Sequence, residues 1–296
     1  MTVAAYIGFM LGHPLASCAS VCLARAASAL VLCTGSLVYA QEAPPEASAI
    51  WQKVHASVFA GAPIDTAAGV ITLDTPQRAE DAAIVPVAIR SQFAQTPTHS
   101  VEKIWLIVDN NPSPIAAVFQ FTVDSGRADI ETRIRVEQYT WVRAIALTQD
   151  GKLHMAAKYV KASGGCSAPA GKDAVAARAN LGRMRLRVAD ASASGEPVLA
   201  QLMISHPNDS GLAMDQVTRL YAAPHFVRRV DVRYGGKPIM SADVDFSISE
   251  NPNFRFYFVP GGSGDLEATV VDNRDLEFAT AVRVDSGRGG TASTMR

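Results

Sequence analysis

Residues 129–137 read Asp-Ile-Glu-Thr-Arg-Ile-Arg-Val-Glu, and this stretch decides the fold class of the chain. Its even-numbered positions carry apolar or β-branched residues, and its odd-numbered positions carry charged ones. Successive side chains of a strand point to opposite faces of a sheet, so this period of two predicts a strand with one buried face and one wet face. Glu131, Arg133 and Arg135 are expected on the wet face.

Segments of this kind recur along the chain, separated by turn sequences such as Asp109-Asn110-Asn111-Pro112 and Gly235-Gly236. Gly, Pro, Asn and Asp favour turns because they adopt backbone conformations that other residues avoid. Short strands separated by turns about every 8–12 residues are typical of β-sandwiches, so the sequence predicts an all-β protein with two such domains. The expected strands are 69–74, 86–92, 101–109, 115–123, 129–137, 140–148 and 152–160, then 183–189, 198–205, 227–234, 238–248, 253–260, 265–272 and 276–284.

Three helical segments are expected outside these strands. Apolar residues of 47–59 recur at i, i+4 and i+8, which is the spacing of one helix face. A helical turn is expected over Gln77–Ala83, after a proline. A further short helix is expected to begin with Asp173 as its cap and to end near Gly182.

Residues 1–40 have the composition of an export signal. They contain one charged residue, Arg25, followed by an apolar run that ends in Val38-Tyr39-Ala40. A basic start, a short apolar core and small residues before the cut are typical of a secretory signal peptide. We therefore expect cleavage after Ala40, a periplasmic protein and no membrane attachment after cleavage. Two alternatives stay open: Leu15-Ala16-Ser17-Cys18 resembles a lipoprotein cleavage site, and the apolar run could be an uncleaved anchor.

Charge and cysteine content narrow the function classes. The formal net charge is -1, which offers no general attraction for nucleic acid or for an anionic membrane. Of the four cysteines, Cys18, Cys22 and Cys33 lie in the expected signal, so the exported chain keeps only Cys166. A lone cysteine in an oxidising compartment cannot form an internal disulfide. It is either buried and inert or used for covalent chemistry, which includes disulfide-linked homodimers.

The segment around Cys166 differs in composition from both β-rich blocks. Residues 162–171 contain no large side chain, and we expect this segment to be a mobile linker. Gly164 and Gly165 would act as the hinge of a swinging arm, because glycine gives the backbone conformational freedom and lets it enter narrow clefts. A glycine turn with an incidental cysteine is the alternative.

No other residue set predicts catalysis or metal binding. His206 and His225 could approach each other, but the histidines lack the spacing of a ligand cluster. No motif for covalent haem or for a phosphate loop is present, so we assign no catalytic residue, no metal site and no cofactor. The sequence therefore favours a protein without autonomous catalysis.

The chain resembles the fused SoxYZ sulfur carriers, and most closely the SoxYZ-like carriers associated with quinoprotein dehydrogenases. The stretches that carry the resemblance are Glu80–Ala83 through Val85-Pro86-Val87, Asp109–Pro114, Val142-Arg143-Ala144, Lys161–Cys166, His206-Pro207, Asn251-Pro252 and Ser263-Gly264. The Gly-Gly-Cys sequence is weak evidence alone, but the ordered set across two domains is more specific.

The resemblance implies two immunoglobulin-like sandwiches, the first SoxY-like and the second SoxZ-like. It implies that Cys166 is the covalent attachment point of a sulfur-containing cargo, as in thiosulfate oxidation, with sulfur-oxidation or quinoprotein dehydrogenase enzymes as partners. Three departures leave the cargo undetermined. Ser167-Ala168-Pro169 follows the cysteine where the family has two glycines, and the arm is internal and tethered at both ends, because a second domain follows it. Residues 206–211 read His-Pro-Asn-Asp-Ser-Gly where the family has His-Pro-Met-x-Thr-Gly.

The expected organisation is therefore a signal peptide at 1–40, a SoxY-like sandwich with its helix at 41–161, and an arm and linker helix at 162–182. A SoxZ-like sandwich at 183–286 and a disordered tail at 287–296 follow. The primary hypothesis is a covalent carrier. The alternatives are an accessory protein of a periplasmic alcohol or methanol dehydrogenase in which the cysteine is dispensable, and a thiol enzyme such as a sulfurtransferase.

Overall fold

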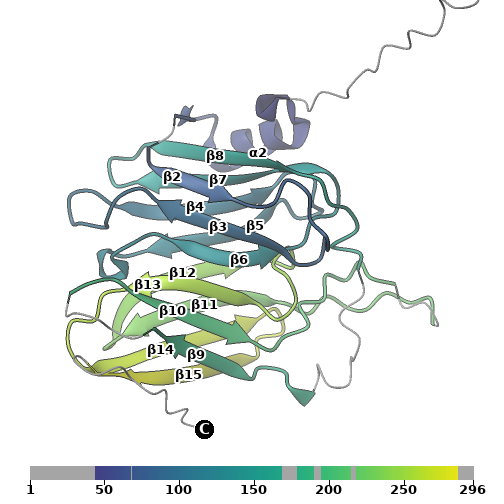
Figure 1. Cartoon of the computed structure of the whole chain (residues 1–296). Helices are drawn as coiled ribbons and strands as arrows, with labels where there is room; N and C mark the ends of the chain where they lie inside the picture. Colours follow the sequence, from purple (N-terminus) through teal and green to yellow (C-terminus); the bar gives the residue numbers. More distant parts are fainter. Residues whose placement is uncertain (1–43, 68, 169–178, 190–194, 215–217, 286–296) are drawn as a thin grey trace, which may run out of the picture. The chain divides into compact units, whose positions relative to one another are not determined.

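Two β-sheets stacked face to face form the body of the protein (Figure 1). The computed structural model describes residues 44–67, 69–168, 179–189, 195–214 and 218–285. One sheet has nine strands in the order β1-β8-β7-β4-β5-β12-β11-β14-β15, and the other has six in the order β2-β3-β6-β13-β10-β9. The all-β prediction is confirmed.

The strands of the first half are β1 (Ile64–Asp65), β2 (Ile71–Asp74), β3 (Val85–Ser91), β4 (Val101–Val108), β5 (Ile115–Phe121), β6 (Ile130–Ile134), β7 (Thr140–Thr148) and β8 (Leu153–Val160). Those of the second half are β9 (Met184–Val188), β10 (Val198–Ile204), β11 (Val227–Tyr234), β12 (Lys237–Val244), β13 (Asn253–Phe258), β14 (Gly264–Asp272) and β15 (Glu277–Val284). The helical elements described are the short 3-10 turns η1 (Pro45–Ala47) and η2 (Val123–Ser125) and the helix α2 (Ala49–Phe59).

The strand predictions are correct wherever polar and apolar residues alternate clearly. The elements that were missed or wrongly predicted have local explanations. The two-residue strand β1, which pairs in parallel with β8, is too short to give a pattern. The helical turn expected over Gln77–Ala83 is wrong. Arg78 instead forms an isolated bridge with Lys161, and the Asp81 carboxylate accepts the amide hydrogen of Ala83 in a turn. This competition between side chain and backbone is typical of aspartate.

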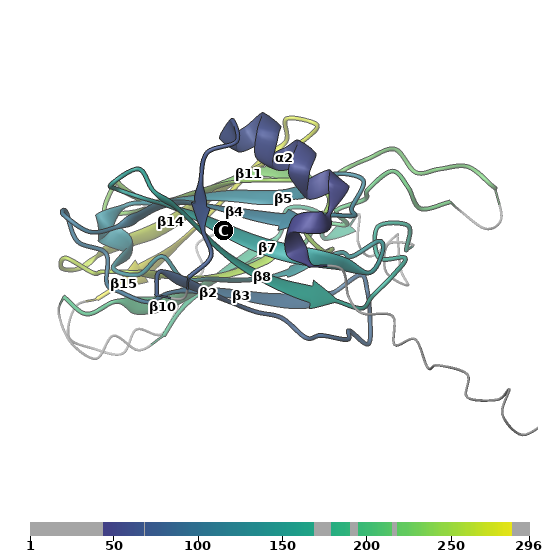
Figure 2. The same ribbon diagram turned by 90° about the horizontal axis from the view of Figure 1, so that it is seen from above.

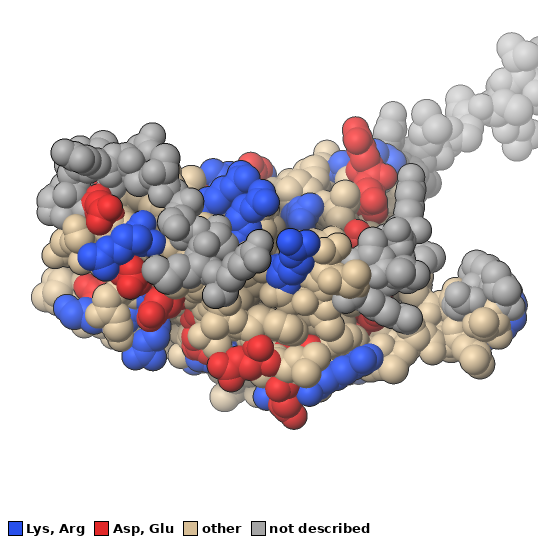
Figure 3. Space-filling model, turned by 90° about the horizontal axis from the view of Figure 1, so that it is seen from below, with Lys and Arg blue, Asp and Glu red and all other residues tan. Residues whose placement is uncertain are grey.

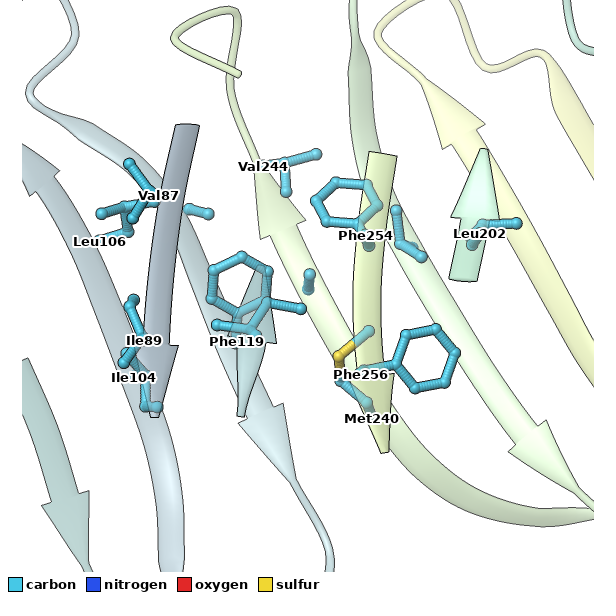
Figure 4. Close-up of a cluster of buried hydrophobic side chains, with 14 of the residues drawn as sticks. Val87, Ile89, Ile104, Leu106, Phe119, Leu202, Met240, Val244, Phe254 and Phe256 are labelled. Atoms are coloured by element: carbon cyan, nitrogen blue, oxygen red, sulfur yellow. The ribbon is translucent and has the colours of Figure 1, made fainter. Parts of the chain in front are cut away.

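Both sheets run across the boundary between the two halves. Strand β5 pairs antiparallel with β12 over Ala117–Phe121, and β6 pairs with β13 in the other sheet. The buried core is correspondingly continuous: the Phe119 ring lies 6.2 Å from the Phe254 ring in an edge-to-face contact. Figure 4 shows the Phe119 ring beside the Phe254 ring, with Phe256 farther along the strand that carries Phe254. The two sandwich halves therefore share their sheets and their core.

The helix α2 covers the outer face of the nine-stranded sheet (Figure 2). Ser48 caps it by accepting the amide hydrogen of Trp51, and Phe59 packs edge-on against Trp105 at 5.0 Å. Below the helix, the fully buried Arg143 forms a two-pronged ion pair with Asp109, with nitrogen–oxygen distances of 2.8 and 2.6 Å. The same guanidinium stacks on Trp51, so the ion pair fixes the helix to the sheet.

Several sequence predictions lie outside the described residues: the signal peptide and its cleavage after Ala40, the helix beginning at Asp173, and the tail at 287–296. Within the described part of the chain, no helix is both long and apolar enough to span a membrane. On the face shown in Figure 3, basic and acidic side chains are interspersed rather than segregated by sign.

The shared core predicts that damage to one half destabilises the other. Phe256 lies in the second half, whereas all three tryptophans lie in the first. Replacing Phe256 with alanine removes a buried ring, which typically costs about 3–5 kcal/mol of the free energy of unfolding. We expect the urea midpoint reported by tryptophan fluorescence to fall as far as the midpoint reported by circular dichroism. The control variant Leu276→Ala, at a position 44% exposed, should leave both midpoints near wild type. A fluorescence midpoint that stays unchanged in the Phe256 variant would contradict the shared core.

Candidate functional site

The only cysteine in the described residues, Cys166, lies in a tight turn that follows β8. Its side chain is buried, with 0% of the residue exposed. Just before the turn, the amide of Lys161 donates to the carbonyl of Gln77, so the chain leaves β8 along the 77–84 segment. The turn then runs against the residues that follow β6.

The described part of the Cys166 segment, residues 162–168, is packed rather than free, which differs from the expectation of a mobile linker. The amides of Gly164 and Gly165 donate to the carbonyls of Glu137 and Val136, each at 2.9 Å. A Cβ atom at Gly165 would collide with the backbone of Ala82 and Val136, so only glycine allows this close approach. The small residues that the sequence places here thus serve close packing in this state.

The two glycines have different local roles. Gly164 has a φ of +82°, in the left-handed region that glycine adopts without strain, and nothing lies within 4 Å of where its Cβ would be. Gly165, in contrast, is enclosed. The backbone can therefore rotate at Gly164 once the contacts of Gly165 and the hydrogen bond from the Gly164 amide to Glu137 are lost.

The carboxylate of Glu137 accepts several hydrogen bonds from the Cys166 turn. It accepts the amide hydrogens of Cys166 at 2.9 Å and of Ser167 at 3.1 Å, and the hydroxyl of Ser167 at 3.0 Å. Successive backbone amides that converge on one anion form a nest, and hydrogen bonds to a charged acceptor are the stronger kind. Glu137 therefore fills an anion-binding turn that contains the cysteine.

A buried arginine lies on the other side of the turn. Arg135 is 2% exposed, and its guanidinium donates to the carbonyls of Gly165 at 3.1 Å and of Asn208 at 3.3 Å. Its Nε has no hydrogen-bond partner, and burial lowers its pKa, while the charges of Glu250, Asp209 and Asp81 act in the opposite direction. The expectation that Arg135 lies on the solvent-exposed face of its strand is wrong, because β6 ends at Ile134 and the Cys166 turn and the loop at Asn208 cover the Arg135 side chain. Burying a charged side chain is costly unless its surroundings compensate it, so a buried guanidinium marks a candidate functional position.

The surroundings of Cys166 suppress its reactivity in this state. Burial, and to a smaller extent the negative charge of Glu137, raise the pKa of the thiol to about 12, although Arg135 acts in the opposite direction. The thiolate is the form that attacks sulfur, so a thiol with this pKa reacts slowly at neutral pH. Chemistry at Cys166 therefore requires the turn to open.

The second half of the chain closes the site. The hydroxyl of Ser210 donates to the carbonyl of Cys166, and Asn208 accepts from Arg135 through its own carbonyl. The side chain of Asn208 also donates to the carbonyl of Ile248 and accepts the amide hydrogen of Val227. The loop that begins at His206 thus connects the thiol turn to the core of the second half.

A buried cluster of two histidines and one aspartate anchors this loop. The rings of His206 and His225 lie 4.6 Å apart, as their expected approach implied, and His225 Nε2 lies 2.7 Å from an Asp272 oxygen. Burial raises the pKa of Asp272, but the hydrogen bond from His225 and the amides of Leu276 and Arg274 outweigh it, so that the pKa is lowered overall.

The cluster does not have the donor set of a metal site in this arrangement. The amide of Asn208 donates to His206 Nδ1 at 3.1 Å, so His206 carries its proton on Nε2, the atom that faces Asp272 at 3.6 Å. A protonated ring nitrogen has no lone pair for a cation, and metal-bound histidines instead donate from their second nitrogen. The three side chains are better described as a hydrogen-bonded anchor.

Sequence reasoning identified Cys166, Gly164 and Gly165 but missed Arg135 and Glu137. Both lie in residues 129–137, where the alternation predicted solvent-exposed side chains at the odd-numbered positions. That pattern contains no information about which segments pack against the end of the strand. Asn111 belongs to a turn that the sequence did single out. It accepts from the amide of Glu137 and donates to the carbonyl of Arg135, so it fixes the segment between these two side chains.

Comparisons with known proteins agree with this layout. Residues 55–166 match the family described as sulfur oxidation protein SoxY, and residues 184–283 match sulphur oxidation protein SoxZ. No curated protein matches the chain significantly.

Solved structures give weaker likenesses. The sulfur carrier protein SoxY from Chlorobium limicola f thiosulfatophilum is 22% identical, with 38% of this chain and 90% of that chain covered and a TM-score of 0.31. A superoxide reductase from Ignicoccus hospitalis is 15% identical, with 31% and 79% covered and a TM-score of 0.29. Likenesses at this level carry no conclusion about activity.

The buried histidine cluster predicts a specific pH dependence of stability. Burial, together with the nearby His225, lowers the pKa of His206 from 6.5 to about 4. Between these values the unfolded chain binds a proton that the folded chain does not, so stability falls as the pH drops through this window. The loss is about 1.4 kcal/mol per pH unit.

We expect the His206→Asn variant, although less stable throughout, to lose most of this slope in urea unfolding curves measured from pH 6.5 to pH 4. The exposed His99 provides the control, since His99→Asn should keep the wild-type slope. An unchanged slope in the His206 variant would rule out the buried neutral histidine as its source.

Proposed function

Because the chain belongs to the fused SoxY–SoxZ proteins, carriers of sulfur oxidation, we propose that Cys166 covalently holds a sulfur-containing intermediate and presents it to partner enzymes. The observation that carries the proposal is the position of this thiol. Cys166 is the last residue of the SoxY match, and it lies in a glycine turn held between the two halves.

Loading of the thiol is an oxidation that the chain does not perform alone. Joining thiosulfate to Cys166 forms one sulfur–sulfur bond and releases a proton and two electrons, which a redox partner protein has to accept. The raised pKa of the buried thiol disfavours unassisted attack. This favours a carrier, whose thiol is activated at a partner, over a thiol enzyme acting by itself.

Delivery requires the turn to leave its packed position. We assign the hinge to Gly164 and Gly165: the first has no neighbour that restricts rotation once its hydrogen bond to Glu137 breaks, and the second, lacking a side chain, can separate from Ala82 and Val136 and return. Both ends of the segment are tethered to a sandwich half, so the thiol is expected to move out locally rather than on a long free arm.

Compartment and partners follow from the same proposal. We place the carrier in the periplasm after removal of residues 1–40, where sulfur-oxidation enzymes, or the quinoprotein dehydrogenases of the related carriers, would receive the cargo. N-terminal sequencing of the exported protein tests the cleavage after Ala40.

The test is a chromosomal Cys166→Ser substitution in the native host. We expect cells with this variant to lose thiosulfate consumption to the level of a deletion strain, while the variant accumulates and unfolds like wild type. The neighbouring Ser163→Ala substitution, at an exposed position, serves as the matched control and should leave consumption unchanged. Normal consumption by the Cys166→Ser strain would overturn the proposal and favour an accessory protein with a dispensable cysteine.

A further inference from the structure

The outer face of the six-stranded sheet carries an excess of positive charge. Figure 2 shows α2 and the strands β2 and β3 on opposite sides of the body, so the helix leaves this face uncovered. The outward side chains of the six strands include five arginines and two carboxylates, although the whole chain has a net charge of -1. We call this surface the arginine face; its charged residues are Arg90, Arg133, Arg185, Arg187 and Arg255, with Asp74 and Glu131.

The pairing of the strands gathers several of these arginines. Gln201 of β10 lies opposite Arg187 of β9 on one side and opposite Arg255 of β13 on the other. Met203 of β10 likewise lies opposite Arg185. Neighbouring strands are about 4.8 Å apart, so guanidinium groups from β9 and β13 are roughly 10 Å apart at their bases. This is about one Debye length at 0.1 M salt, so their fields reinforce one another at low salt.

A groove with a volume of about 670 Å³ crosses the same face over β2, β3, β6 and β13. Arg90, Arg133 and Arg255 line it, together with the apolar ring of Pro86. Glu131, which also lines the groove, pairs with Arg90 at 2.7 Å and with Arg255 at 2.6 Å, so one carboxylate holds two guanidinium groups in place. A broad bilayer surface cannot enter a groove of this size, whereas a projecting acidic segment of a protein can.

The residues between the arginines also fit a protein partner. Leu199, Met203 and Tyr257 point outward from β10 and β13, and each is partly exposed. Arg, Tyr and Met are enriched at protein–protein interfaces, where aromatic and aliphatic side chains supply apolar contact. Arginine adds specificity because its guanidinium can bind a carboxylate through two parallel hydrogen bonds. The arginine face therefore suits a protein surface that combines carboxylates with apolar groups.

Strand β6 connects the arginine face to the thiol. Arg133 lies in β6 and lines the groove, and two residues farther along the chain Arg135 donates to the carbonyl of Gly165, directly before Cys166. Residues two positions apart in an extended chain are separated by about 7 Å. A protein bound over the groove is therefore beside the Cys166 turn.

We propose that the arginine face is the docking surface for an acidic patch on the partner enzymes that load and unload Cys166. The inference rests on the proposed function and adds to it the place where partners bind and the chemistry that they present, which is a cluster of carboxylates beside the entrance to their own sites. Complementary charge speeds the encounter and sets its orientation, and the apolar residues contribute contact area once the surfaces meet.

The first measurement uses a fluorescein-labelled decaglutamate peptide and the full-length chain, with binding followed by fluorescence anisotropy. We expect binding at about 25 mM salt that is lost at about 500 mM salt, because ions screen exposed charges. The variant Arg185→Glu/Arg187→Glu, with both changes at exposed positions, should bind at least about tenfold more weakly.

The matched control is Arg233→Glu/Arg283→Glu, which changes the net charge equally at exposed positions of the nine-stranded sheet. It should bind the peptide within about twofold of wild type. Equal weakening in the two variants, or no binding by the wild-type chain at low salt, would overturn the docking surface.

Vesicles containing phosphatidylglycerol test the other class of acidic partner. We expect the chain not to sediment with these vesicles through Arg185 and Arg187. Sedimentation that the Arg185→Glu/Arg187→Glu change abolishes, together with peptide binding that the same change leaves intact, would assign the arginine face to a lipid surface and overturn the proposal.

The last measurement is thiosulfate consumption by the native host with the Arg185→Glu/Arg187→Glu change on its chromosome. We expect consumption to slow severalfold while the variant accumulates and unfolds like wild type, and the Arg233→Glu/Arg283→Glu strain to consume normally. Normal consumption by the Arg185→Glu/Arg187→Glu strain would overturn the docking surface but leave the carrier function intact. Failure of the carrier function itself has a separate signature, which is normal consumption by the Cys166→Ser strain.

Discussion

The buried guanidinium of Arg135 is the point on which the site depends. It joins the segment after β6 to the carbonyl before Cys166 and to the carbonyl of Asn208, so one side chain connects the first half, the thiol turn and the second half. The backbone of this segment is also held by hydrogen bonds. The amide of Arg135 donates to the carbonyl of Ser247, and the amide of Val136 donates to the carbonyl of Ala82. Burial lowers the pKa of this guanidinium, and the charges of Glu250, Asp209 and Asp81 act in the opposite direction.

The continuity of the two sheets explains how this junction can be rigid. Strand β6 pairs with β13 immediately before Arg135, and β5 pairs with β12 in the facing sheet. The core between them contains Phe119 and Phe254 in contact. A thiol turn clamped between halves that share a core can be held in one closed position, whereas two sandwiches on a flexible tether could not hold it. Fusing the halves in one chain keeps the clamp assembled at any protein concentration.

Most of the fold could be predicted from the sequence, whereas only the cysteine segment of the site could be. Alternation at Ile130–Ile134 and the Gly235-Gly236 turn depend on local physics, and both predicted the structure correctly. The burial of Arg135 depends on a loop about seventy residues away in the sequence. The local alternation of polar and apolar residues contains no information about such a distant contact. Likewise, the approach of His206 and His225 could be anticipated, but their partner Asp272 comes from the end of β14 and is brought there by strand pairing. Residues 162–168 were expected to be mobile because they are small, yet small residues equally permit tight packing.

The central claim, that Cys166 bears a covalent cargo, is tested most directly by intact mass spectrometry of the chain purified without reductant from its native host growing on thiosulfate. The account predicts an added mass that dithiothreitol removes, that maps to the peptide containing Cys166, and that corresponds to a sulfur chain ending in a sulfonate. A bare thiol, or a disulfide-linked dimer with no other adduct, would contradict it.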